Sequence, residues 1–138
     1  MANDRKTTPE HVTSLAENEV FVFGSNKEGQ HWGGAAKFAY DNFGAEWGVG
    51  IGMTGQSYAI PTMDGDLEII RSYVKDFNDY AKAHPEQTFL VTPIGCGIAG
   101  WRAEEIAPLF KEASRLDNVS LPESFWNIIE MTAPAGPE

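Results

Sequence analysis

The chain has 138 residues, of which 42% are hydrophobic, a length and composition typical of one globular domain that buries its own core. Its net charge of −10 argues against attraction to duplex nucleic acid or anionic membranes, but does not exclude a small anion held by backbone N–H groups. A single cysteine, Cys96, excludes an intramolecular disulfide and a cysteine-based zinc site, and no apolar run approaches the roughly 20 residues of a membrane helix.

Apolar patterning in the first half of the chain predicts alternating strands and helices. Four consecutive apolar residues at 20–23 are typical of a strand buried on both faces, and Pro9 after Thr8 is typical of the first turn of a helix. Glycines at alternate positions within Gly48–Gly55 favour a strand pair. One face of that pair would lack side chains, so another backbone could approach it. The predicted elements are a helix at Pro9–Leu15, a strand at Val20–Phe23, a helix from Gly33 to Phe43, a strand pair within Gly48–Gly55 and a strand at Ser57–Pro61.

The second half continues the alternation. Asp66 precedes a long segment with helical apolar spacing and predicts its N-cap, and His84-Pro85 predicts its end. Pro108 lies inside the next helical segment and predicts a kink or a late start there, because proline lacks a backbone N–H. The predicted elements are a helix at Leu67–Ala83, a strand at Thr88–Thr92, a helix at Ala103–Arg115 and a strand at Phe125–Met131.

The domain is expected to span residues 1–138, with loose tails at 1–8 and 132–138. Met1–Thr8 is polar and lacks the apolar core of a secretory signal, so the cytoplasm is the expected compartment. The order strand, glycine-rich loop, helix occurs twice, which predicts a three-layer α/β/α sandwich around a mixed, largely parallel sheet. Val20–Phe23 and Thr88–Thr92 should be central, parallel neighbours in that sheet, because both runs are almost wholly apolar.

Both glycine-rich loops are expected at the carboxyl ends of strands, where α/β sheets bind ligands. Glycine lets a phosphate approach main-chain N–H groups, and the positive end of a helix dipole favours the anion. The sequence therefore predicts a phosphate-bearing nucleotide between the loops, with no metal and no resident cofactor. The predicted ligand-binding residues are Gly24, Ser25, Asn26, Gly33, Gly34, Ala35, Gly95, Cys96, Gly97, Ile98, Ala99, Gly100 and Trp101.

A few side chains carry alternative interpretations. Asn26 can bind a ribose hydroxyl or order a water, or can simply stabilise a turn. Asp64 can face the cleft as an acid or base. Cys96 can act as a nucleophile with His31, but a small side chain packed beside a phosphate is the favoured interpretation. Trp32 or Trp101 can stack on a base or cover the ligand, or can simply pack against the protein.

Three blocks of the sequence, in their order, resemble the macro domain family. They are Val22-Phe23-Gly24-Ser25-Asn26, then Gly33-Gly34-Ala35-Ala36 with Phe43-Gly44, then the stretch from Thr92-Pro93-Ile94 to Gly100-Trp101. This resemblance implies an ADP-ribose-binding fold and a small bacterial or phage branch of the family.

The resemblance leaves two functions open. One is a module that binds ADP-ribose or a related nucleotide; the other is a hydrolase that removes ADP-ribose from protein or nucleic acid, with Asn26 and Asp64 ordering the water. Ala36 stands where one hydrolytic branch has an aspartate, and Tyr40 is the nearest match to the lysine of another. The family's Gly-Asp-Ile motif, which implies adenine recognition, has no counterpart. These departures favour binding.

Overall fold

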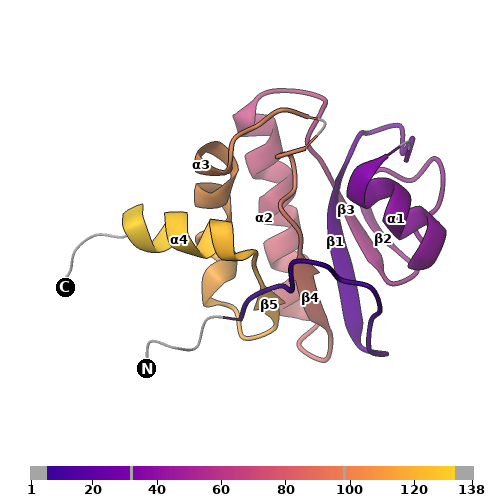
Figure 1. Ribbon diagram of the computed structural model, residues 1–138, viewed down its shortest axis with the longest axis horizontal. Coiled ribbons are helices and arrows are strands. Elements are labelled where there is room, and N and C mark those ends of the chain that lie inside the picture. The colour runs from indigo at the N-terminus through magenta and orange to yellow at the C-terminus, as the bar shows by residue number, and fades with distance from the viewer. Residues whose placement is uncertain (1–5, 32, 98, 133–138) are drawn as a thin grey trace.

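The computed structural model describes residues 6–31, 33–97 and 99–132, which form one mixed β-sheet with helices packed on both faces (Figure 1). The strands are β1 (Glu19–Ser25), β2 (Gly52–Thr54), β3 (Ser57–Pro61), β4 (Thr88–Val91) and β5 (Val119–Ser120). The helices are α1 (Gly34–Asn42), α2 (Leu67–Ala83), α3 (Ala103–Ile106) and α4 (Glu123–Thr132), with short 3₁₀ helices η1 (Ala107–Phe110) and η2 (Ala113–Arg115).

The sheet has the order β2-β3-β1-β4-β5. β1 pairs in parallel with β3 and β4, and β4 pairs in parallel with β5, whereas β2 and β3 form an antiparallel hairpin. In the central register, Val22 lies between Tyr58 of β3 and Val91 of β4. The predicted α/β class is confirmed, and so is the prediction that the two apolar strands are adjacent and parallel.

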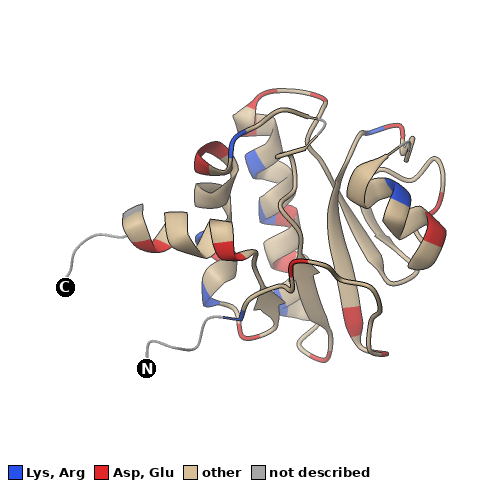
Figure 2. Cartoon of the chain, in the orientation of Figure 1, with Lys and Arg blue, Asp and Glu red and all other residues tan. Residues whose placement is uncertain are grey.

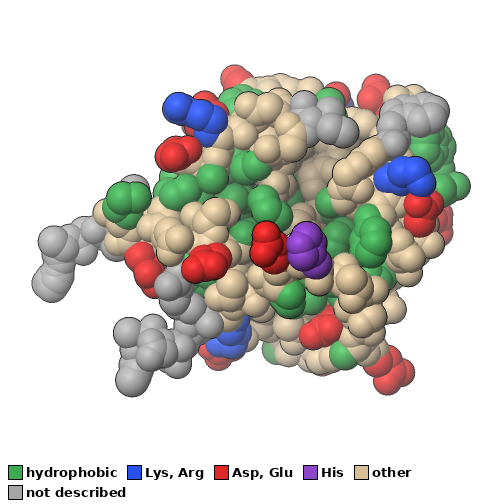
Figure 3. Space-filling model, in the orientation of Figure 1, with side chains coloured by type: hydrophobic (Ala, Val, Ile, Leu, Met, Phe, Trp, Pro, Cys, Tyr) green, Lys and Arg blue, Asp and Glu red, His purple; other side chains and the backbone are tan. Residues whose placement is uncertain are grey.

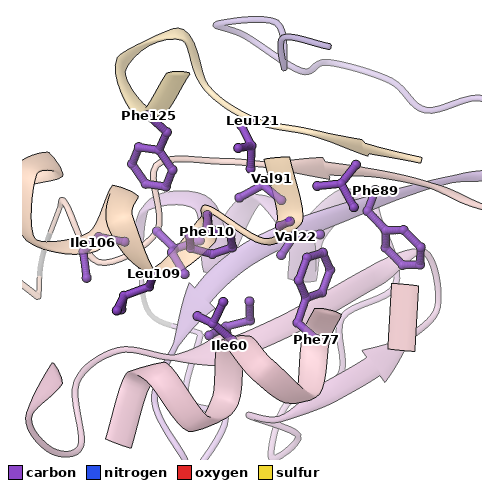
Figure 4. Packing of buried hydrophobic residues seen from close by; sticks show 14 of the residues in the cluster. Val22, Ile60, Phe77, Phe89, Val91, Ile106, Leu109, Phe110, Leu121 and Phe125 are labelled. Atoms are coloured by element: carbon purple, nitrogen blue, oxygen red, sulfur yellow. The ribbon is translucent and has the colours of Figure 1, made fainter. Parts of the chain in front are cut away.

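Alternate residues of β1 supply two separate hydrophobic clusters. Val20 and Val22 join the larger cluster, which α2, α3, η1 and α4 cover (Figure 4). Phe21 and Phe23 point to the other face, where α1 packs on them. Since both faces of the strand are buried, its sequence shows no polar alternation.

Helix α2 begins and ends as its sequence indicates, whereas the helix predicted at Ala103–Arg115 is divided into α3, η1 and η2. Asp66 caps α2 through a hydrogen bond from the Ile69 N–H to its carboxylate, 3.1 Å long. α3 stops at Ile106, and the chain continues as a 3₁₀ helix around Pro108, as expected for a residue that cannot donate to the preceding turn. In the part of the chain that the structure describes, no helix has both the length and the apolar character to cross a membrane.

Three predicted elements are wrong. The stretch Gly48–Gly55 holds one strand, β2, which pairs with β3, and not a strand pair of its own. Pro9–Leu15 is not helical; Val12 and Leu15 instead pack against the cluster beneath α1 as irregular chain. Phe125–Met131 belongs to helix α4 rather than to a strand. In that helix Phe125 and Ile129 are buried four residues apart, which is helical spacing, and a short apolar run does not distinguish this from a buried strand.

The N-terminal residues of the described chain are attached to the far edge of the sheet. The Thr8 N–H donates to the Leu121 carbonyl at 2.9 Å, and the Leu121 N–H donates to the Lys6 carbonyl at the same distance. The indole N–H of Trp126 also donates to Lys6. Residues 6–8 of the expected tail are therefore part of the folded domain.

Candidate functional site

A cleft of about 240 Å³ opens at the carboxyl ends of β1 and β4. The two glycine-rich loops form opposite walls of this cleft, and the surface in Figure 3 is hollowed between them, towards the top of the view. The predicted ligand-binding residues that line it are Gly24, Ser25, Asn26, Gly33, Gly34, Ala35, Gly95, Gly97 and Ala99.

The first wall is the beginning of α1. Its N-cap is Gly33, in extended conformation, and no side chain caps the helix. The N–H groups of the first helical turn have no partner within a helix, and here they lie beside the cleft. Gly34 has φ +61, a conformation that favours glycine, and a Cβ there would meet nothing within 4 Å. This wall therefore offers main-chain donors and the positive end of a helix dipole.

The second wall is the loop from Pro93 to Trp101. Hydrogen bonds within this loop use the N–H groups of Cys96, Gly100 and Trp101, with acceptors at Pro93, Gly97 and Gly95. Among the described residues, no acceptor is found for the N–H groups of Gly97 and Ala99, both of which line the cleft. The loop is thus held by its own bonds while keeping free donors at the cleft.

The remaining predicted ligand-binding residues do not line the cleft. Cys96 packs against the larger hydrophobic cluster, and Gly100 lies outside the lining. Trp101 also packs against that cluster, and its indole N–H donates to the Thr62 carbonyl at 2.8 Å, so it fastens the second loop to the end of β3. Ile98 and Trp32 fall outside the described residues.

Asn26 lines the cleft but its amide is engaged. Its Oδ1 accepts the Gln30 N–H at 2.8 Å, and its Nδ2 donates to the Gln30 carbonyl at 3.0 Å. These two bonds close the loop that precedes α1. Asn26 thus has the turn-stabilising role that was the alternative to ligand binding. One N–H and one lone pair of the amide remain for a ligand.

Asn26→Ala should destabilise the protein by about 1–2 kcal/mol, because it removes both hydrogen bonds to Gln30. Urea denaturation followed by circular dichroism measures this free energy. Asn26→Asp keeps the acceptor for the Gln30 N–H but sets a carboxylate oxygen against the Gln30 carbonyl, so it should lose at least as much. Equal stability of wild type and Asn26→Ala would show that the two bonds do not hold the loop.

The carboxylate of Asp64 makes a structural hydrogen bond. Its Oδ2 accepts the main-chain N–H of Lys27 at 2.7 Å, which connects the β1–α1 loop to the segment after β3. Asp64 is not among the residues that line the cleft. This position does not favour the predicted role of Asp64 in ordering a water.

Cys96 and His31 do not form a nucleophile–base pair. Burial, with smaller contributions from Glu104 and Glu105, raises the pKa of the Cys96 thiol and so disfavours the thiolate. His31 is 2% exposed and lies among aromatic rings beneath α1, with its Nε2 bonded to the Glu46 carbonyl at 2.9 Å. The thiol packs on one face of the sheet and the imidazole on the other.

Several cleft residues were missed by the sequence interpretation. Thr62 and Thr92 directly follow β3 and β4, so the rule that ligands gather at carboxyl strand ends was sufficient to find them. Thr92 donates its hydroxyl to the Val22 carbonyl at 2.8 Å and stabilises the sheet. The other missed lining residues are Gln30, Ala36, Met63, Pro93 and Ile94.

A larger groove of about 850 Å³ adjoins the cleft. The two share Gly34, Ala35, Thr92 and Pro93, and the groove continues towards residues 7–13 and the start of α4. Its walls combine apolar side chains with polar and charged ones: Phe21, Phe38, Val12, Glu10, His11, Glu123 and Ser124. Cleft and groove together offer a small compartment with an uncharged lining beside a larger one that includes charged residues.

No known family model matches the chain, and no curated protein matches its sequence. Within the described residues, no group of three or more histidine, cysteine, aspartate or glutamate side chains is arranged to hold a metal ion. The interpretation of the cleft therefore depends on its geometry.

Proposed function

We propose that this protein binds ADP-ribose or a related phosphate-bearing nucleotide, with the phosphates between the two glycine-rich loops. The observation that carries the proposal is that α1's uncapped first turn and the N–H groups of Gly97 and Ala99, which have no acceptor among the described residues, belong to one cleft. Main-chain donors on both sides suit a phosphate chain, which presents oxygens in two directions. The macro domain resemblance of the sequence agrees with this proposal.

The sizes of the two compartments support a ligand larger than a phosphate. The cleft, at about 240 Å³, is below the range of roughly 300–1,000 Å³ that is usual for small-molecule sites. The adjoining groove adds about 850 Å³ and has aromatic walls at Phe21 and Phe38. We assign the phosphates to the cleft and a nucleoside portion to the groove.

Removal of ADP-ribose from protein or nucleic acid is the alternative function. It needs a positioned water and a group that accepts a proton. Asn26 is bonded to Gln30, Asp64 is bonded to Lys27, and the pKa of the Cys96 thiol is raised. Since these contacts favour structural roles, we propose binding rather than hydrolysis. The single cysteine and the net charge of −10 support a cytoplasmic protein that does not bind duplex nucleic acid directly.

ADP-ribose should stabilise the folded protein, because a ligand that binds only the native state raises its free energy of unfolding. The expected gain is about 2.7 kcal/mol at a free concentration 100 times the dissociation constant. A thermal-shift series with ADP-ribose, ADP, NAD and cyclic ADP-ribose, followed by calorimetry, measures it. Absence of both heat and thermal shift at millimolar concentration for all four would refute the proposed function.

A further inference from the structure

The cleft is built without charge. Each of its described lining residues is glycine, alanine, or another uncharged residue, and the protein as a whole carries a net charge of −10. In Figure 2 the acidic residues are spread over helices, loops and one strand of the fold. The basic residues nearest in sequence to the lining are Lys27 and Lys37; Lys37 is paired with Asp41 at 2.6 Å. An anion in this cleft is therefore stabilised by dipoles, in a field that opposes negative charge.

Thr62 adds one hydroxyl to the floor of the cleft. The residue is 2% exposed, its N–H donates to the Ser25 carbonyl at 2.9 Å, and its carbonyl accepts from Trp101. Its Oγ1 lies 3.1 Å from the position that a Cβ on Gly24 would occupy. The backbone of Thr62 is thus fixed on both sides, and its hydroxyl lies at the cleft lining beside Gly24, where an occupant of the cleft can meet it.

Such a site discriminates between phosphates by their charge. The free energy of removing an ion from water rises with the square of its charge, so a dianion loses far more hydration than a monoanion. Each phosphate of a pyrophosphate bridge carries one negative charge, whereas a terminal phosphate approaches two at neutral pH, since its second pKa is about 6. Lysine or arginine normally offsets the second charge, and none lines this cleft.

We propose that the cleft selects a phosphate esterified on both sides, as in a pyrophosphate bridge, over a terminal phosphate, and that the Thr62 hydroxyl donates to it. This inference rests on the proposed function and narrows its ligand class. Nucleotides that end in a free phosphate are disfavoured, and nucleotides that continue beyond their second phosphate are preferred. The neutral lining gives the selection, and Thr62 gives a side-chain donor on its floor.

ADP and its β-methyl ester test the selection, because the ester differs from ADP by one methyl group and one negative charge. Calorimetry at pH 7.5 should show the ester binding about tenfold more tightly or better. At pH 5.5 the terminal phosphate of ADP holds a proton, so the difference should shrink. Changes in the ionisation of the protein between the two pH values alter its affinity for both ligands alike. They therefore cancel in the ratio of the two affinities. Equal affinity at pH 7.5, or tighter binding of ADP, would overturn the selection.

Met63 offers a matched pair of variants. Its side chain lines the cleft and is 50% exposed, so a long polar residue fits there without disturbing the core. Met63→Arg supplies the missing cation and should remove or reverse the preference for the ester. Met63→Gln adds a polar chain without charge and should keep the preference. If the ratio of the affinities for the ester and for ADP is the same in both variants, charge does not govern the preference for the ester.

Thr62→Val and Thr62→Ser isolate the hydroxyl. Valine removes the donor with little change in shape and should weaken the ester about 10- to 100-fold, whereas serine should stay within about threefold of wild type. Unchanged affinity in Thr62→Val would remove Thr62 from the site while leaving the proposed function intact. If wild type binds neither ADP, its ester nor ADP-ribose, the proposed function and this inference both fail.

Discussion

Replacing Gly97 by valine should abolish nucleotide binding and leave the fold intact. A Cβ at Gly97 would meet nothing within 4 Å, and the residue does not need a left-handed backbone. Gly97 lines the cleft, so the three added carbons occupy the space of a ligand and shield the main-chain donors. We expect a loss of affinity of more than about 100-fold, equivalent to about 2.8 kcal/mol. Calorimetry with ADP-ribose measures the affinity and urea denaturation measures the stability.

Two further variants control for the position. Gly97→Ala adds one carbon and should weaken binding by a smaller factor, and Ala83→Val, at an exposed site at the end of α2, should bind like wild type. Gly95→Ala should instead lose stability, because φ is +75 and the Cβ would lie 3.2 Å from the Trp101 ring. Wild-type affinity in folded Gly97→Val would exclude the cleft as the phosphate site.

Gly50→Ala is expected to cost about 3 kcal/mol of stability and to weaken binding as well. A Cβ at Gly50 would overlap the Asn26 carbonyl oxygen and would lie 2.8 Å from that of Lys27. The Ser25 hydroxyl donates to the Gly50 carbonyl in the same contact. The added atom must therefore push apart two backbones that together position the first wall of the cleft, and overpacking of this kind costs up to about 3 kcal/mol. Urea denaturation and calorimetry measure the two effects.

Gly48→Ala is the control for backbone strain. Gly48 has φ +92, but a Cβ there would meet nothing within 4 Å. It should cost about 1 kcal/mol through conformation alone and leave affinity unchanged. If Gly50→Ala costs no more than Gly48→Ala, the close approach of the two backbones is not a source of stability.

The parallel strands were predictable because they are buried on both faces. Val20–Phe23 supplies valines to one cluster and phenylalanines to the other, and an unbroken apolar run is the sequence signature of that position. Residues 125–131 carry a similar apolar character in a helix. In so short a segment, the burial of Phe125 and Ile129 on one side is decided by packing against η1 and α3, which local sequence does not encode.

The glycine loops were predictable as the walls of one cleft, since each follows a strand of the parallel sheet and opens towards the same edge. The roles of individual side chains were not. The partners of Asn26, Asp64 and Trp101 are Gln30, Lys27 and Thr62, and the last two contacts join segments more than 30 residues apart. Which polar groups remain free after such contacts form depends on the tertiary structure.

The two hydrophobic clusters have unequal sizes, and this inequality bears on the dynamics of the cleft. α1 is held by the smaller cluster and has no side-chain cap, whereas α2 and α4 are anchored in the larger one. Local opening follows the weaker packing, so the amides of α1 should exchange with solvent hydrogen faster than those of α2. A ligand bound at the first turn of α1 should slow that exchange. The proposed binding can therefore be followed by the hydrogen exchange of one short helix.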